Sequence, residues 1–129
     1  MIALIQHTNN VSYTEVRDAI KDIDMDITEI VVMPTEHNSL CCMAKQYANR
    51  RHIPIKEFKI EWERFDRSPR YRKQGKYGAI NTYAPFHRYI DALEYADVLI
   101  AVTKEPKDFG AKFIKCIHQL CKPIRRRKV

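Results

Sequence analysis

The segment ADVLIAV, residues 96–102, is the most apolar strand candidate in the 129-residue chain. It shows no alternation of polar and apolar residues, and such a short run predicts a strand that is buried on both faces of a parallel sheet. Two further apolar runs, IALIQ (2–6) and TEIVVM (28–33), predict buried strands of the same kind. The fold therefore depends on how these three strands are connected.

Helical patterns separate the predicted strands. Ser12 and Glu15 form a capping box, which is followed by apolar residues at helical spacing. Ser39 and Asp108 are placed to cap two further helices, and Pro85 suits the first turn of another. Four helices are therefore expected between the strands, beginning near these residues.

Two shorter segments, IPIKEF (53–58) and PIRRR (123–127), predict the remaining strands. Strands that alternate with helices predict an α/β fold, here a three-layer sandwich in which helices cover both faces of a five-stranded parallel sheet. The expected strand order is 3-2-1-4-5, which puts the two charged strands at the edges, where charge is tolerated. Helices one and two are expected on one face, and helices three and four on the other. Residues 1–129 are expected to form a single domain.

The same topology predicts a ligand site at one edge of the sheet. Ligands of open parallel sheets bind beyond the carboxyl ends of the strands, at the point where the winding reverses. In the expected order, this crevice lies between strands one and four. The residues at this edge that we expect to bind the ligand are His7, Thr8, Asn9, Thr35, Glu36, Thr103 and Lys104.

Residues 70–86, RYRKQGKYGAINTYAPF, predict an irregular loop that is rich in cations and aromatic rings and holds two of the three glycines. Because this loop follows strand three, we expect it to lie over the crevice as a lid. Lys76 and Tyr77 are then ligand contacts, one for a phosphate and one for a base. The aromatic rings of the loop have two alternatives, which are stacking on a nucleobase and folding back over the loop itself.

Charge is unevenly distributed along the chain, whose net charge is +7. Residues 1–49 carry three Lys or Arg against seven acids, residues 50–76 carry ten against four, and residues 122–128 carry five and no acid. A basic surface attracts phosphate groups and nucleic acid, although a solvated charged face is the ordinary explanation. A nucleic-acid-binding protein that uses residues 64–76 and 122–128 is therefore the alternative function.

The cysteines and the apolar runs limit the class of protein. The four cysteines show no zinc-ligand spacing and predict small buried side chains rather than a metal site or a disulfide. No apolar run has the length of a membrane span, and the N-terminus does not show the pattern of a signal peptide. A cytoplasmic protein without a cofactor or a membrane contact is expected.

Three stretches of the chain resemble the YspA-type branch of the SLOG superfamily. They are VVMPTEHNSLCCMAKQYANRRHIPIKEFKIEWERF (31–65), KYGAINTYAPFHRYIDALEYADVLIAV (76–102) and DFGAKFIKCIHQLCKPI (108–124). The resemblance covers most of the chain. It implies a Rossmann-like domain that binds nucleotides or nucleotide-derived small molecules.

The chain departs from the glycine-rich turns of this family, so it resembles a divergent member with degenerate glycine motifs. The family's Arg-Asn pair is represented by Asn81 alone, and its Gly-Thr helix start by Gly110 and Ala111. Glycines let a backbone approach a phosphate closely, so charge has to replace them. Lys112, in the first turn of the expected fourth helix, is a candidate for that charge.

The resemblance implies a protein that binds a nucleotide-type molecule as a sensor or by sequestering it, which also fits a phage-encoded protein. Related SLOG members hydrolyse N-glycosidic bonds of nucleotides, so such a hydrolase is a third alternative. We expect no enzyme, because the hydrolase pattern is missing near 105–114; Glu36 and His37 are the candidate acid and base. A homodimer or larger assembly is expected, because SLOG relatives self-associate and the third helix carries extra aromatic residues.

Overall fold

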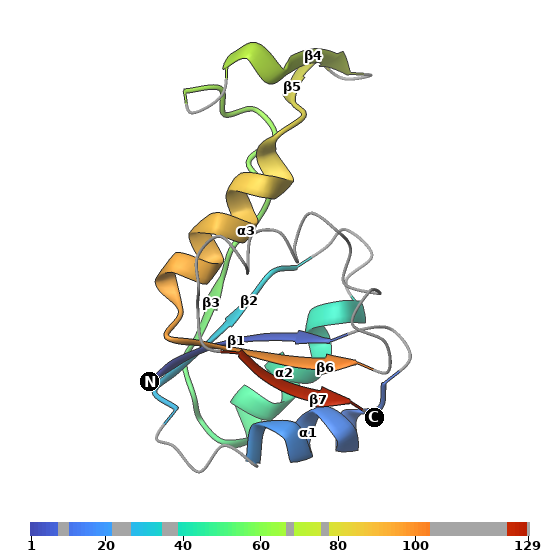
Figure 1. The fold of residues 1–129 in the computed structure, drawn as a ribbon, viewed down its shortest axis with the longest axis vertical. Coiled ribbons are helices and arrows are strands. Elements are labelled where there is room, and N and C mark those ends of the chain that lie inside the picture. Colours follow the sequence, from blue (N-terminus) through green and yellow to red (C-terminus); the bar gives the residue numbers. More distant parts are fainter. Residues whose placement is uncertain are drawn as a thin grey trace.

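The computed structural model describes residues 1–7, 11–21, 27–34, 39–66, 69–75, 78–103 and 124–128. Its elements alternate between strands and helices, as expected for an α/β fold (Figure 1). In chain order they are β1 (Ile2–His7), α1 (Tyr13–Lys21), β2 (Glu29–Val32), α2 (Ser39–Arg50), β3 (Ile55–Glu57), the 3-10 turn η1 (Pro69–Tyr71), β4 (Arg72–Gly75), β5 (Gly78–Asn81), α3 (Ala84–Tyr95), β6 (Val98–Thr103) and β7 (Ile124–Lys128).

The main sheet is parallel, and the order of four of its strands, β3-β2-β1-β6, is confirmed. β7 pairs in parallel with the outer edge of β6, with Leu99 opposite Ile124. The two central strands, β1 and β6, are tied at their amino ends by reciprocal bonds. The Ile2 N–H donates to the Asp97 carboxylate over 2.8 Å, and the Asp97 N–H donates to the Ile2 carbonyl over 2.8 Å. These bonds fix the register of the pair.

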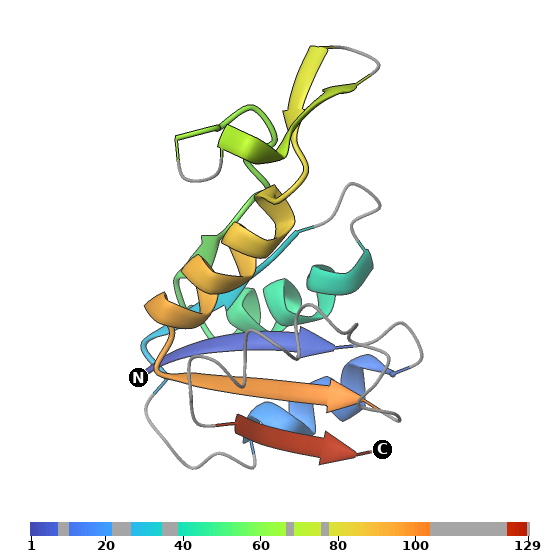
Figure 2. The same cartoon turned by 45° about the horizontal axis from the view of Figure 1, so that its top comes forward.

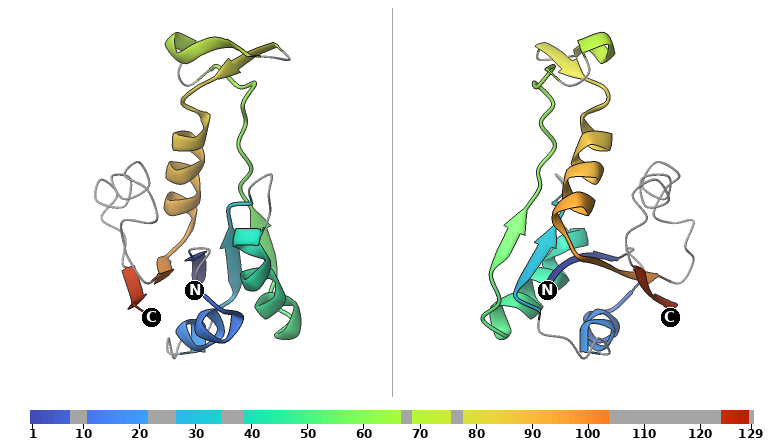
Figure 3. Two further views of the ribbon diagram at one scale, coloured as in Figure 1. Left: turned by 90° about the vertical axis from the view of Figure 1, so that its right-hand side faces the viewer. Right: turned by 60° about the vertical axis from the view of Figure 1, so that its left-hand side comes forward.

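The sheet separates two apolar cores. Ala3 and Ile5 on β1 pack into the core beneath α1 and α2, whereas Leu4 between them packs into the core beneath α3. Alternate residues of a strand point to opposite faces, which is why a strand between two layers is apolar throughout. The predicted arrangement, in which the first two helices cover one face of the sheet and the third covers the other, is therefore confirmed (Figure 3). The predicted fourth helix lies outside the described residues.

The predicted helix starts are borne out where the structure describes them. The Glu15 N–H donates to the Ser12 hydroxyl over 3.3 Å, which is the first half of the capping box. Pro85 lies in the first turn of α3, where a missing N–H removes no intrahelical bond. The apolar stripes that follow these starts are buried or half-buried where the structure describes their side chains, so periodicity predicted these helices correctly.

Residues 70–86 are not an irregular loop, and that prediction is wrong. After η1, the strands β4 and β5 form an antiparallel hairpin, and α3 follows directly. The glycines make this hairpin possible. A Cβ on Gly75 would lie 3.0 Å from the Gly78 carbonyl oxygen, and Gly78 has a φ of +132°, which side chains rarely allow. Two of the three glycines lie in the hairpin because one position has little room for a side chain and the other has a backbone angle that favours glycine.

The hairpin is also not a lid over the crevice between β1 and β6. Residues 58–66, here called the arm, leave β3 and run beside α3 to the hairpin, which lies at the far end of α3 from the sheet (Figures 1 and 2). An extended chain advances about 3.3 Å per residue, so the arm carries the hairpin away from the strand ends. The Asn81 N–H then fixes it there by donating to the Trp62 carbonyl over 2.6 Å.

Candidate functional site

The carboxyl ends of β1 and β6 meet at the predicted point where the winding reverses. His7 ends β1 opposite Val102, and Thr103 ends β6. Both side chains are buried, with exposed fractions of 2% and 0%. The structure therefore brings two of the predicted ligand-binding residues together. The other predicted residues of this crevice lie outside the described residues, namely Thr8, Asn9, Thr35, Glu36, His37, Lys104, Gly110 and Lys112.

Asn81 lies in a different place, at the junction of the hairpin, the arm and α3. Its side-chain amide donates to the Arg64 carbonyl over 2.8 Å, and its side-chain oxygen accepts from the Tyr83 N–H over 2.9 Å. The side chain is only 1% exposed. These bonds make Asn81 a positioning residue that holds the arm against the start of α3. Lys76 and Tyr77, which were predicted as ligand contacts beside it, lie outside the described residues.

The aromatic rings of this region pack on one another. The rings of Tyr71 and Tyr83 stack with centroids 4.7 Å apart, and the Tyr83 ring also contacts Phe86 at 4.6 Å and His87 at 4.8 Å. Of the two alternatives for these rings, Tyr71 and Tyr83 follow the one in which they fold back. Tyr83 and Phe86 are therefore used inside the chain. Tyr95 at the end of α3 is 38% exposed, but its ring lies 5.6 Å from that of Phe58 and its hydroxyl donates to the Glu29 carboxylate.

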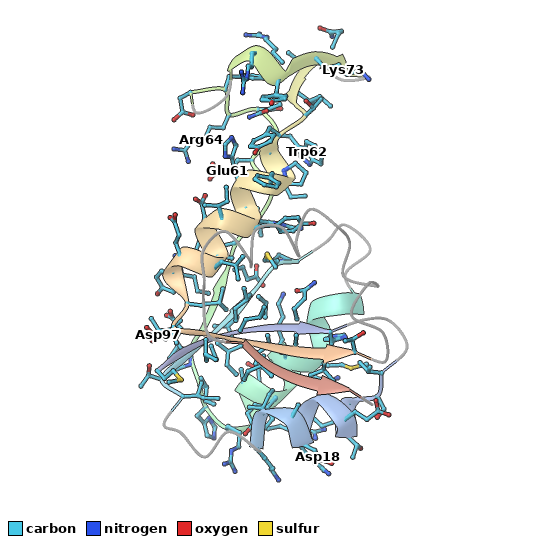
Figure 4. All side chains as sticks on the ribbon, in the orientation of Figure 1. Asp18, Glu61, Trp62, Arg64, Lys73 and Asp97 are labelled. Carbon is cyan, nitrogen blue, oxygen red and sulfur yellow. The ribbon has the colours of Figure 1, made fainter. Side chains whose placement is uncertain are left out.

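A cavity of about 340 Å³ opens between the arm and α3, beyond the carboxyl end of β3. Sequence reasoning missed it. Its lining residues are Lys56, Glu57, Phe58, Lys59, Glu61, Arg64, Asn81, Ala84, His87, Arg88 and Asp91. Figure 4 shows Glu61, Trp62 and Arg64 on the arm beside α3. The available signal was the spacing of Ala84, His87, Arg88 and Asp91, which puts a small and polar stripe on one face of a helix.

The charges around this cavity are largely paired by the chain itself. Arg64 on the arm bonds Asp66 over 2.8 Å and Glu61 over 2.9 Å, and these carboxylates raise the pKa of its guanidinium. Arg88 on α3 is buried, and its guanidinium donates to the Pro34 carbonyl over 2.7 Å. That bond ties α3 to the end of β2, because hydrogen bonds to charged groups are among the stronger ones. The cavity wall is thus a mixed and mostly neutralised surface.

Glu57, one of the residues that line this cavity, is paired with Lys45 on α2. The hydrogen bond from Lys45 is the main reason why the pKa of Glu57 is lowered from its ordinary value of 4.5. Because the pKa of Glu57 is lower in the folded state, the pair contributes its full stabilisation of the fold at pH values above the unfolded-state pKa. That contribution is lost as the pH falls through the depressed value.

Replacing Lys45 with methionine is expected to raise the pKa of Glu57 toward 4.5, because the bond that favours its ionised form is removed. NMR titration of the Glu57 side chain measures this change. Lys59→Met is the matched control, since the Lys59 ammonium is 4.0 Å from the other Glu57 oxygen and has the smaller effect on this pKa. An unchanged titration in the Lys45 variant, or a larger change in the Lys59 variant, would contradict the pairing.

The comparisons with known proteins identify no relative. No family model matches the chain, and neither does any curated protein or solved structure. Within the described ranges, no three His, Cys, Asp or Glu side chains are grouped so that they could hold a metal ion. None of the described helices is long and apolar enough to cross a membrane. The function therefore has to be argued from the fold and the site alone.

Proposed function

We propose that the chain binds a nucleotide or a nucleotide-derived small molecule at the carboxyl ends of β1 and β6, as a sensor or a sequestering protein. The observation that supports this best is the pair of buried polar residues, His7 and Thr103, at the ends of the two central strands. The proposal includes a Rossmann-like three-layer sandwich with the five-strand order β3-β2-β1-β6-β7. It also includes membership of the SLOG superfamily and the expected self-association.

The physical argument starts from β6, whose residues Val98–Val102 are all apolar and buried before Thr103 follows. β1 also ends in polar residues, the half-buried Gln6 and the buried His7. Two neighbouring strands thus end in polar groups at the edge where open parallel sheets take up their ligands.

The phosphate of the proposed ligand requires positive charge, because the glycine turns that commonly hold phosphates are missing from the sequence. Lys104 follows β6 directly, and Lys112 lies farther along the same connection. We propose these two lysines as phosphate contacts. A charge-assisted contact of this kind contributes about 1.5–3 kcal/mol, which corresponds to a change in affinity of about 10- to 150-fold.

Calorimetric titration of the full chain with a panel of nucleotides tests the proposal. Lys104→Ala and Lys112→Ala are each expected to weaken binding of the best panel member by about 10- to 150-fold. Thr103→Val, which keeps the side-chain volume but removes the hydroxyl, is expected to weaken it as well. Lys21→Ala is the control, because Lys21 is exposed in the last turn of α1. The proposal fails if no panel member binds, or if the Lys104 and Lys112 variants bind like the Lys21 variant.

A further inference from the structure

The hairpin, taken from here on together with the preceding turn η1, carries three exposed cations. Arg70 lies on η1, and Arg72 and Lys73 lie on β4. None of the three forms an ion pair with a carboxylate of the described part of the chain. Arg64 on the arm differs, because it is held between two carboxylates. The hairpin cations are therefore available to an anionic partner.

Two of these cations are held in place by aromatic rings. The guanidinium carbon of Arg72 lies 4.5 Å from the centre of the Phe65 ring, and that of Arg70 lies 5.1 Å from the centre of the Tyr71 ring. A guanidinium that rests on a ring keeps its N–H groups free at its edge, where they can donate to phosphate oxygens. Because the rings restrict the arginines beforehand, less conformational entropy is lost when a partner binds.

The position of the hairpin leaves room for a large partner. It lies at the far end of α3 from the sheet in every view, and Figure 4 shows Lys73 at this outer end (Figures 1, 3 and 4). β7, which carries the basic residues 125–128, lies beside β6 at the opposite end of the molecule. The hairpin and β7, which belong to the two basic segments of the alternative function, 64–76 and 122–128, therefore do not form one surface.

The shape of the hairpin favours one class of nucleic acid. A two-stranded antiparallel ribbon fits the major groove of B-form DNA, whereas the major groove of A-form RNA is too deep and narrow. Binding of single strands relies on aromatic rings that stack on bases. Tyr71 and Tyr83 are stacked on each other instead, and Tyr71 also lies against Arg70.

We propose that the hairpin of η1, β4 and β5 binds the phosphate backbone of duplex DNA through Arg70, Arg72 and Lys73, without the basic residues of β7. This interface is separate from the proposed nucleotide site, since it lies at the other end of α3. Contacts to phosphates carry no sequence information, so the expected binding is independent of sequence. Its strength comes from the release of counterions when the three cations approach the duplex.

Fluorescence anisotropy of a short labelled B-form duplex, titrated with the full chain at several salt concentrations, tests the interface. Three phosphate contacts predict a slope of about −2.7 for the logarithm of the binding constant against that of the salt concentration. The binding constant then falls about 40-fold between about 50 and 200 mM salt. Lys73→Gln is expected to reduce the magnitude of this slope by about one, and it disturbs no ring contact among the described residues. A parent chain that does not bind the duplex overturns the proposal.

Two matched triple variants test whether the hairpin or β7 binds the duplex. The triple variant Arg70→Gln, Arg72→Gln and Lys73→Gln is expected to lose nearly all of the salt-dependent binding. The triple variant Arg125→Gln, Arg126→Gln and Arg127→Gln is expected to keep it. The proposal is overturned if the hairpin triple variant keeps the binding and the β7 triple variant loses it. The Arg72→Lys variant keeps the charge, so it is expected to retain binding, and binding as weak as that of the hairpin triple variant also overturns the proposal.

Two further ligands check the choice of duplex DNA. An RNA duplex and a single strand of the same sequence are expected to bind more weakly than the B-form duplex. Tighter binding of either one overturns the groove assignment. Thermal melting of each variant shows whether the fold is retained, and the Lys73 variant decides the question if the triple variant melts early.

Discussion

Replacing Leu93 with alanine is expected to lower the free energy of unfolding by about 3–5 kcal/mol. Leu93 is 1% exposed on the inner face of α3 and packs in the same core as Leu4, Val31 and Leu99 from three neighbouring strands. Truncation leaves a cavity between a helix and a sheet, two rigid layers that cannot close over it. The expected loss is a large share of the stability of an ordinary domain, about 5–15 kcal/mol.

Denaturant unfolding of the two proteins measures this loss. Leu93→Met is the conservative variant and should cost less than about 1.5 kcal/mol, because it nearly preserves the volume. Gln46→Ala on α2 removes a side chain that is exposed, so a change within about 0.5 kcal/mol is expected. If Leu93→Ala costs no more than the Gln46 variant, α3 does not pack on the sheet as described.

Replacing Asn81 with alanine is expected to cost about 2–4 kcal/mol and to free the arm from the start of α3. The variant leaves the Tyr83 N–H and the Arg64 carbonyl without the bonds that Asn81 provides. Both bonds are partly buried, so the polar groups left unpaired add to the cost of the lost bonds. The effect is local, so amides of the arm should lose protection before those of the sheet.

Hydrogen exchange measures that local loss, and denaturant unfolding measures the total. Thr82→Ala is the neighbouring control, since the Thr82 hydroxyl also bonds a carbonyl, that of Tyr71 over 2.9 Å, but the side chain is exposed. Its expected cost is about 0.5–1.5 kcal/mol. An Asn81 variant that costs no more than the Thr82 variant, with the arm equally protected, would show that Asn81 does not hold the arm.

The apolar strands and helices were predictable because their signals are local. The run at 96–102 and the stripes of α1 and α3 each bury one continuous set of side chains, and a short window of sequence contains each set. The strand at 53–58 is shorter than predicted, with β3 covering only Ile55–Glu57. The pairing of β3 stops where it reaches Val32 of β2, and the alternation in the sequence of β3 does not mark that point.

The hairpin could not be found in this way. β4 reads Arg72, Lys73, Gln74 and Gly75, and its first three side chains are all exposed, so no alternation marks a strand. Its register depends on Gly75 and Gly78, whose importance shows only when the two strands lie together. The cavity was missed for a similar reason, because it exists only once the arm runs along α3. Neither the hairpin nor the arm carries a periodic signal, and the one signal for the cavity is the polar stripe of α3.

The central position of β1 has a consequence for the order of events during synthesis. β1 pairs with β2, about 27 residues away, but its other partner, β6, is about 95 residues away. While the ribosome is still adding the segment between them, β1, β2 and β3 can already associate. One hydrogen-bonding edge of β1 then stays open until β6 emerges, and open edges of this kind recruit other chains. We expect a pause in synthesis after β3 and before β6 has emerged from the ribosome to favour aggregation of the nascent chain.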